Sequence, residues 1–529
     1  MNCIETCTYK EIKTNKNYTF ETIHLNSGKF SEHSYTFLDT SENTVFLHVN
    51  HFGEESTYGH VYVSDIEGVR FSLSLPHNIR SYDNQCDFER VLGLDGIYIA
   101  NSISSEFMNN NLEEIDREEL EDADRMDEPT HKKSKSPKAE KSARNYIKTQ
   151  ITFNKGGTWE DIKAPQRDSE GKLFDCDNEC YLHLHGISGD FPPFYTVDSA
   201  AGIILSNGNV GEYLSHDAEE ISTFLSRDGG VSWFEVRKGS HIYEIGDHGA
   251  LLVIANDQSP TDTLLYSWDE GMTWQELRFS QDKIMVKNII IEPTSTSLHF
   301  VVYGESQTRK GKKRGVVVGV NFTTLNERRC NNPEEPDSPN SDYEKWSPSD
   351  GRGNHSCLLG RKMIYVRRKR EVDCFNGQDF ERKTLVEYCT CTNYDYECDE
   401  GFSRPSHSEA CTPLDPDHKL PAEGDVHKPP ENCHGYFSIS KGYRKVPGNV
   451  CVNGVKYDPI IVPCPYSGFF SSLGIIFFIL ILLVLFGLVF LAFNNSFVDS
   501  VKDFVDKNKK PVREVKTGKY IDIVSYSKY

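Results

Sequence analysis

The octapeptide SWDEGMTW at residues 267–274 carries two adjacent carboxylates and a glycine, and it ends on tryptophan. Two related stretches lie upstream, TFNKGGTW at 152–159 and SRDGGVSW at 226–233. The three copies share the pattern Ser/Thr-x-Asp/Asn-x-Gly-x-Ser/Thr-Trp, and a weaker copy, SDIEGVRF at 64–71, ends on phenylalanine. A recurring unit of this kind indicates a repeated architecture before it indicates a catalytic site.

Each shared position of this pattern has a structural explanation. The short Asp or Asn side chain can accept hydrogen bonds from backbone amides across a hairpin turn, and glycine adopts backbone conformations that other residues resist. The closing tryptophan offers an apolar plate to a neighbouring sheet. The pattern resembles the Asp-box, a structural hairpin turn on the blades of β-propellers. We therefore predict structural turns at Asn154, Gly156, Trp159, Asp228, Gly230, Trp233, Asp269, Gly271 and Trp274.

The adjacent carboxylates of Asp269 and Glu270 do not favour a glycosidase. Such an enzyme needs two carboxyl groups that face each other across a cleft, whereas these two lie on one hairpin. We expect Asp269 to shape the turn and Glu270 to face solvent.

Short β-type runs such as TVFLHVN, AGIILSNG and ALLVIAN occur between about residues 19 and 322, separated by turn residues. Strands of this length at regular spacing suggest a propeller or a sandwich. The turns favour a propeller, with room for about five or six blades of four strands. The segment from about 106 to 145 is acidic and then basic, and we expect a disordered insertion there.

The apolar stretch GIIFFILILLVLFGLVFLAF at 474–493 predicts a transmembrane helix. It holds twenty residues without a charge, enough to cross a hydrocarbon layer of about 30 Å. Basic residues follow it, so the C-terminus is expected in the cytosol and the preceding part in the lumen. The formal charge of -21 disfavours nucleic acid as a partner and suits a solvated ectodomain. The first twenty residues contain no apolar core of a secretory signal, so either the late helix directs translocation or the start of the chain is missing.

Ten of the fifteen cysteines fall between residues 330 and 464. A dense, even set in turn-rich sequence predicts a disulfide framework formed in an oxidising compartment. Zinc is the alternative, but the paired C-x-x-C knuckles are missing. Cys176 and Cys180 are expected to form a local bridge, whereas Cys3, Cys7 and Cys86 have no obvious partners. Glycosylation sequons lie at Asn17, Asn321 and Asn354.

The order of these features resembles the sortilin family of vacuolar and lysosomal sorting receptors. Besides the turns, the resemblance rests on DFERVLGLDGIYIAN (87–101), CDNECYLHLHG (176–186), CLLGRK (357–362) and GYRKVPGNVC (442–451). It implies a ten-bladed propeller with a ligand-binding tunnel, of which this chain has room for half to two thirds, followed by two small cysteine-rich modules. By the same resemblance the pairs would be Cys330–Cys374, Cys357–Cys389, Cys391–Cys451, Cys398–Cys411 and Cys433–Cys464.

Four regions are expected along the chain: a partial propeller (1–325), ten-cysteine modules (326–466), a transmembrane helix (469–493) and a cytosolic tail (494–529). In the tail, the YIDI sequence fits a tyrosine-based signal in which Tyr520 and Ile523 enter two pockets of a coat adaptor. A retromer-type complex is the alternative partner expected for the cytosolic tail.

The leading hypothesis is a non-enzymatic receptor that binds soluble hydrolases or propeptides in the lumen and cycles between late Golgi and endosomes. His183 and His185 could supply a pH switch for release, although such a pair more often packs or faces solvent. The alternatives are a truncated, non-binding paralogue and an Asp-box sialidase or related glycosidase. No motif indicates a catalytic residue, a metal site or a cofactor.

Overall fold

The structure is a computed structural model of the 529-residue chain. It describes residues 24–25, 34–51, 56–66, 68–81, 83–108, 143–175, 180–307, 311–325, 327–352, 356–377, 383–404, 409–414, 429, 433, 435–464, 477–485 and 504. Strands form nearly all the regular structure of these residues, which confirms the predicted β class. The chain divides into two compact units, residues 1–425 with 439–460, and residues 426–438 with 461–529.

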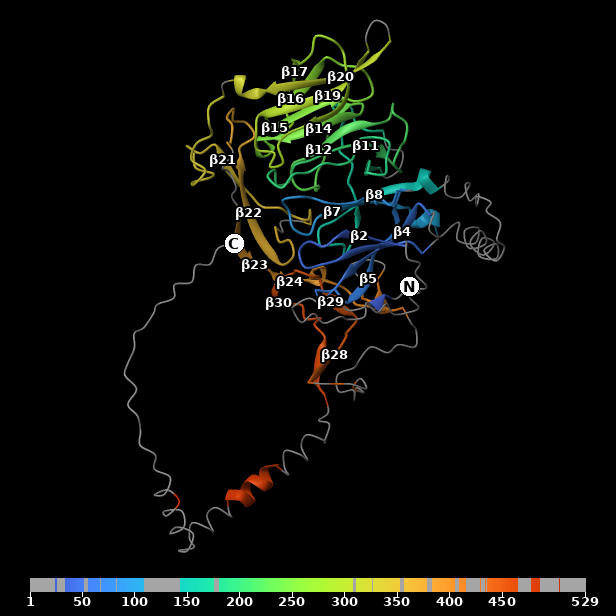
Figure 1. The fold of residues 1–529 in the computed structure, drawn as a ribbon, viewed down its shortest axis with the longest axis vertical. Coiled ribbons are helices and arrows are strands. Elements are labelled where there is room, and N and C mark those ends of the chain that lie inside the picture. Colours follow the sequence, from blue (N-terminus) through green and yellow to red (C-terminus); the bar gives the residue numbers. More distant parts are fainter. Residues whose placement is uncertain are drawn as a thin grey trace, which may run out of the picture. The chain divides into compact units, whose positions relative to one another are not determined.

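The first unit begins with a nine-stranded sheet, coloured blue to cyan in Figure 1. Its strands join in the order β2-β3-β4-β5-β7-β8-β9, with β1 paired to β5 and β6 paired to β7. The strands are β1 (His24–Leu25), β2 (Tyr35–Asp39), β3 (Phe46–Val49), β4 (Tyr58–Ser64), β5 (Arg70–Ile79), β6 (Phe88–Arg90), β7 (Tyr98–Ile103), β8 (Ile147–Thr152) and β9 (Glu160–Asp161).

Three smaller antiparallel sheets follow, and each joins its strands in sequence order. The second sheet holds β10 (Tyr181–Leu184), β11 (Ile204–Gly211), β12 (Ser222–Ser226) and β13 (Phe234–Lys238). The third holds β14 (His241–Gly246), β15 (Leu251–Asn256), β16 (Thr263–Ser267) and β17 (Gln275–Arg278). The fourth holds β18 (Met285–Ile290), β19 (His299–Gln307) and β20 (Lys313–Asn321).

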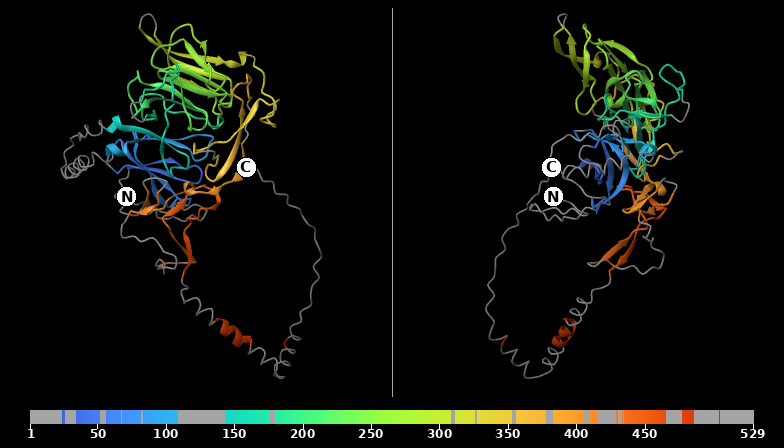
Figure 2. Two further views of the ribbon diagram at one scale, coloured as in Figure 1. Left: turned by 180° about the vertical axis from the view of Figure 1, so that it is seen from behind. Right: turned by 90° about the vertical axis from the view of Figure 1, so that its right-hand side faces the viewer.

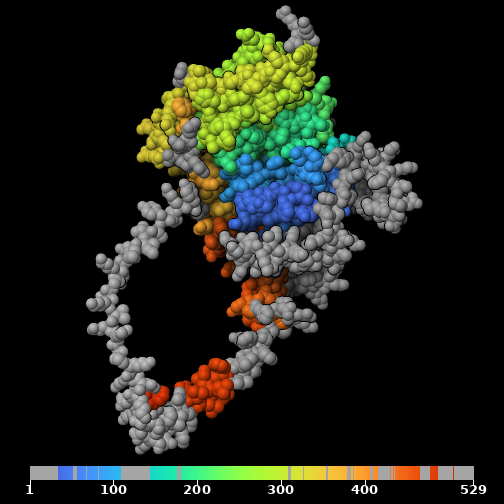
Figure 3. Space-filling view, viewed as in Figure 1, coloured from blue at the N-terminus to red at the C-terminus, as the bar shows by residue number. Residues whose placement is uncertain are grey.

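Three hydrophobic cores join these four sheets in succession. The first core combines Ile99 of the first sheet with Leu184 of the second. The other two cores join the second sheet to the third and the third to the fourth. Because each middle sheet is covered on both faces, a strand such as β12 is buried at every position. On the face shown in Figure 3 the sheets succeed one another from blue through green to yellow.

This succession of small meandering sheets resembles consecutive propeller blades. The described residues do not close the sheets into a ring, as the two views of Figure 2 show. The partial propeller expected from the sequence therefore stays a prediction.

The cysteine-rich part starts with the three-stranded sheet β21 (Tyr343–Trp346), β22 (Arg361–Arg368) and β23 (Lys383–Tyr388). Four strand pairs follow: β24 (Thr390–Cys391) with β30 (Val452–Gly454), β25 (Tyr396–Cys398) with β29 (Tyr443–Lys445), β26 (Phe402–Ser403) with β27 (Thr412–Pro413), and β28 (Tyr436–Ile439) with β31 (Ile460–Pro463). Short 3-10 turns are η1 (Arg144–Tyr146), η2 (Asp247–Gly249), η3 (Phe322–Leu325) and η4 (Asn393–Asp395).

The predicted transmembrane helix at 469–493 falls mostly outside the described residues. Residues 477–485 are helical, and their large apolar side chains are exposed. Over the described residues, no helix is both long and apolar enough to cross a membrane.

Candidate functional site

The Asp-box-like turns use their side chains as the pattern predicts. In the second sheet, the Asp228 Oδ1 accepts hydrogen bonds from the Ser226 hydroxyl and the Ser232 amide, each at 2.9 Å. The Ser226 hydroxyl in turn accepts the Gly230 amide at 2.9 Å. Gly230 has a φ of 96°, in the left-handed region where an added side chain is strained. These contacts close the turn between β12 and β13.

The other two copies have the same geometry. Asn154 Oδ1 accepts the Thr158 amide at 2.9 Å, and Asp269 Oδ1 accepts the Thr273 amide at 2.8 Å. Burial opposes ionisation of Asp269, but the hydrogen bonds from Thr273 and Ser267 outweigh it and lower the pKa of this carboxyl. Asp269 is therefore held as an acceptor within the turn.

The expected exposure of Glu270 is wrong. This residue is only 4% exposed, and its carboxylate accepts a hydrogen bond from the Arg227 Nε at 2.8 Å. The Arg370 guanidinium donates to the backbone oxygen of Glu270 at 3.0 Å. The turn that carries Glu270 therefore contacts the cysteine-rich part. The local sequence pattern could not predict this contact.

Five disulfides in the described residues join Cys330 to Cys374, Cys357 to Cys389, Cys391 to Cys451, Cys398 to Cys411, and Cys433 to Cys464. They are the five pairs that the family resemblance implies. Cys180 is disulfide-bonded, and its predicted partner Cys176 lies outside the described residues, as do Cys3 and Cys7. Cys86 is a buried free thiol.

Two buried arginines fasten the cysteine-rich part to the sheets. Arg444 of β29 donates to the backbone oxygens of Val63 and Arg70 at 2.8 and 2.9 Å. Arg368 of β22 donates to the backbone oxygens of Trp268 and Cys374. Each guanidinium satisfies carbonyl groups that would otherwise be buried without donors.

A cavity of about 1330 Å³ lies where loops of the second, third and fourth sheets face β22. Its lining includes Tyr195, Glu244, Glu292, Tyr365 and Asn376. The Asn376 backbone amide donates to the Asp247 carboxylate at 2.9 Å, which ties the Cys374 loop to the turn after β14. Sequence reasoning did not identify this cavity. The basic run RKMIYVRRKR at 361–370 is the sequence feature that could have indicated it, because this run supplies the arginines that contact the turns.

The two histidines proposed as a pH switch are both fully buried. The His183 Nδ1 accepts the Thr149 amide at 3.1 Å, and its Nε2 lies 3.0 Å from the Glu212 backbone oxygen. One neutral tautomer satisfies both contacts. Burial lowers the pKa of His183 and of His185 to about 4, below the late-endosomal range, so packing explains this pair better than switching does.

We expect stability to fall on acidification because of buried histidines such as His183. In the unfolded chain the His183 imidazole has its ordinary pKa of 6.5, whereas in the folded chain burial lowers this pKa to about 4. Stability is therefore lost as the pH falls through this window, by at most about 3 kcal/mol for one such group. His183→Gln should flatten the plot of unfolding free energy against pH between 7 and 4. Leu182→Ala, which removes no titrating group, should lower that plot without flattening it; an unchanged slope in His183→Gln would contradict this assignment.

The remaining predicted sites are mostly beyond the described residues. Asn321 is exposed at the end of β20, and its side chain accepts the Thr323 amide at 2.9 Å. Asn17 and Asn354 lie outside the described residues, as do Tyr520 and Ile523 of the tail. No cluster of three or more His, Cys, Asp or Glu side chains suited to a metal ion occurs in the part of the chain that the structure describes.

Family models account for most of the chain. The model described as "Sortilin, neurotensin receptor 3" matches residues 8–289, and the corresponding C-terminal model matches residues 291–464. The chain belongs to the sortilin family. The family resemblance of the sequence is therefore confirmed, and the sortilin family is a non-enzymatic one.

Two of the curated relatives of this sortilin-family chain come from fungi. It is 34% identical over 452 residues to a "Vacuolar protein sorting/targeting protein 10" of Debaryomyces hansenii, and this match covers 82% of the chain and 26% of that protein. It is 33% identical over 448 residues to the protein of the same name from Laccaria bicolor, covering 82% of the chain and 28% of that protein. The chain thus spans about a quarter of the length of these relatives.

Two of the solved structures that match the chain are only remotely similar to it. A GH74 enzyme of Niastella koreensis matches with a TM-score of 0.28 at 11% identity, covering 65% of this chain and 46% of the enzyme. An arabinofuranosidase of Fusarium graminearum matches with a TM-score of 0.24 at 9% identity, covering 53% of this chain and 72% of the enzyme. Likeness at this level carries no argument about activity.

Proposed function

We propose that the chain is a single-pass sorting receptor of the Golgi and endosomes, with its β-sheets and cysteine-rich modules in the lumen and its tail in the cytosol. The observation that carries the proposal is the order of features: both sortilin models match in succession up to residue 464, and the uncharged stretch 474–493 follows. The five disulfides support an oxidising compartment.

In this proposal each region of the chain has its own role. Residues 1–325 form propeller blades and 326–466 form the cysteine-rich modules, and together they bind soluble hydrolases or propeptides. Residues 469–493 cross the membrane. Residues 494–529 present Tyr520 and Ile523 to a coat adaptor or a retromer-type complex, so that cargo binding is coupled to transport.

Glycan mapping tests the proposed orientation. The natively expressed full chain is analysed by mass spectrometry at Asn17, Asn321 and Asn354, with Asn321→Gln as the control for the exposed site at the end of β20. Occupied sites with oxidised cysteines support a lumenal ectodomain. Bare sites together with reduced cysteines would overturn the receptor proposal, because the chain would never have entered the secretory pathway.

A pull-down separates the receptor from a non-binding paralogue. The chain is captured from its own membranes by an affinity tag on the cytosolic tail, and the co-purified proteins are identified. Recovery of soluble hydrolases supports the receptor. Correctly glycosylated chain that recovers no lumenal protein favours the paralogue, whose fold would be the same but whose cargo binding would be lost.

A further inference from the structure

The cavity facing β22 contains polar atoms that lack partners among the described residues. Glu244 of β14 is 6% exposed. Its Oε1 accepts hydrogen bonds from the Tyr195 hydroxyl at 2.8 Å and the Ile245 amide at 2.9 Å. The Oε2 of Glu292 and the Oδ1 of Asn376 are buried without a hydrogen bond to any described residue. Asn376 is itself only 4% exposed, so an unsatisfied acceptor of this kind is costly unless a ligand donates to it.

The acidic side of this cavity has no ion-paired counter-ion among the described residues. Neither Glu244 nor Glu292 forms an ion pair with a described basic side chain, and the two carboxyls are close enough for Glu292 to act on Glu244. Burial first, and then the neighbouring Glu292, raise the pKa of Glu244 to about 7. Glu292 is only partly buried, and hydrogen bonds from the Thr296 and Ser297 amides to its Oε1 outweigh burial and lower the pKa of its carboxyl, so it is a carboxylate. A cation entering here would relieve the repulsion between the two carboxylates and the desolvation of Glu244.

The two arginines of the lining are already engaged elsewhere, and the lining also holds the exposed Lys383. The Arg367 Nε donates to the Glu344 carboxylate at 2.8 Å, and its guanidinium also donates to the backbone oxygen of Arg227 at 2.8 Å. Arg368 is committed to backbone carbonyls, including those of Val372 and Cys374. They hold the cysteine-rich part against the sheets and are not placed to neutralise Glu244.

The walls and the size of the cavity favour a peptide over a small amine. Apolar surface is supplied by Tyr195, Val197, Ile291 and Tyr365. The volume of about 1330 Å³ exceeds the roughly 300–1,000 Å³ of typical small-molecule sites. There is therefore room for a charged side chain, its aliphatic stem and the residues on either side of it.

We propose that this cavity binds a peptide through one basic side chain, whose ammonium or guanidinium donates to Glu244, Glu292 and Asn376. An ammonium offers three donors and a guanidinium five, which suits three acceptors, and the aliphatic stem packs on the apolar walls. The proposal deepens the receptor function above by naming a class of ligand and the residues that hold it.

Peptide binding to the purified full chain in detergent tests the proposal. The probe is a blocked pentapeptide with a central arginine between leucines, and its partner peptide carries uncharged citrulline at the same position. Calorimetry at pH 8 should detect the arginine peptide, with the citrulline peptide at least about tenfold weaker, since losing one partner of a buried charge pair is expensive. Equal affinity for the two peptides, or no binding of the arginine peptide, would overturn the proposal.

Two variants place the binding in this cavity. Glu244→Gln keeps the size and an oxygen for Tyr195 and Ile245, and it should weaken the arginine peptide at least about tenfold while its melting temperature shows that the fold is intact. Glu305→Gln removes a carboxylate of β19 that pairs with Lys313 and does not line the cavity, so it should bind like the wild type. If the Glu244→Gln variant binds the arginine peptide with an affinity within twofold of the wild type, the proposed site is wrong.

A pH series gives an independent readout. A bound cation favours the charged form of Glu244, so the affinity of the wild type should fall as the pH drops from 8 to 6, through the pKa of about 7. Tyr195 and Glu292 act on Glu244 from the adjoining loops. The other charged or titratable groups of the lining are Asp198, His248, Glu270, Tyr365, Arg367, Arg368 and Lys383. Glu244→Gln should lose most of this dependence, and an undiminished dependence would contradict its role. Because the peptide assay uses isolated protein, its failure would leave the glycan and pull-down results, and hence the receptor proposal, intact.

Discussion

We expect Arg444→Ala to lower the free energy of unfolding by about 3–5 kcal/mol. Arg444 is 9% exposed, and its Nε donates to the Glu397 carboxylate at 2.7 Å. Glu397 is 3% exposed and would keep a buried charge without its partner, while the carbonyls of Val63 and Arg70 would lose their donors. Denaturant unfolding of the full chain, followed by tryptophan fluorescence, measures the loss.

Two further variants separate the charge of Arg444 from its shape. Arg444→Lys keeps the charge but cannot fork toward three acceptors, so we expect an intermediate loss. The double change Arg444→Met with Glu397→Leu removes both charges, and it should recover part of the stability lost by Arg444→Ala because no uncompensated charge is left. A loss below about 1 kcal/mol in Arg444→Ala would show that the pair is solvated rather than buried.

The turns could be predicted from the sequence because every contact that shapes them is local. In each copy the acceptor side chain bonds residues two before and four after it, as Asp228 does with Ser226 and Ser232. The strands could be predicted for a similar reason, since short β-branched runs between turn residues fit a pleated sheet whatever lies around it. The pairing of the cysteines needed the family resemblance, because ten cysteines allow many pairings.

The surroundings of the turns could not be predicted, because they depend on residues far apart in the chain. Glu270 is covered by Arg370, a hundred positions later, and Asn376 reaches Asp247 across 129 positions. The local pattern predicts that Glu270 is exposed on the outside of a hairpin. Glu270 is instead buried because the cysteine-rich part packs against the third sheet. The cavity beside Glu244 has the same origin, since no single segment supplies its walls.

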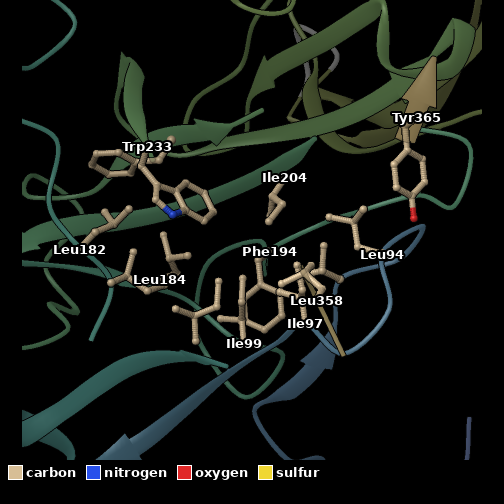
Figure 4. Close-up of a cluster of buried hydrophobic side chains, with 14 residues drawn as sticks. Leu94, Ile97, Ile99, Leu182, Leu184, Phe194, Ile204, Trp233, Leu358 and Tyr365 are labelled. Carbon is tan, nitrogen blue, oxygen red and sulfur yellow. The ribbon is translucent and has the colours of Figure 1, made fainter. Parts of the chain in front are cut away.

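The three turn tryptophans should differ in their importance for stability, and Trp233 should matter most. Trp233 is 5% exposed and belongs to the core between the first two sheets, where Figure 4 shows it among Leu182, Leu184 and Ile204. Its indole nitrogen also donates to the Gly230 backbone oxygen at 3.0 Å. We expect Trp233→Ala to cost about 3–5 kcal/mol, because a large cavity would open in the middle of this core. Denaturant unfolding of the full chain, followed by circular dichroism, measures the loss.

Trp274 provides the matched control, because it closes the same turn pattern in the third sheet. It is only partly buried beside its core, and its buried indole nitrogen has no hydrogen-bond partner among the described residues, so Trp274→Ala should cost clearly less than Trp233→Ala. The core around Trp233 also includes Leu358 and Tyr365 of the cysteine-rich part. Trp233→Ala should therefore loosen this part as well, and the Cys357–Cys389 disulfide beside Leu358 should be reduced faster by a mild thiol. Equal losses in the two alanine variants would mean that the turns, rather than the cores they face, determine what each tryptophan contributes.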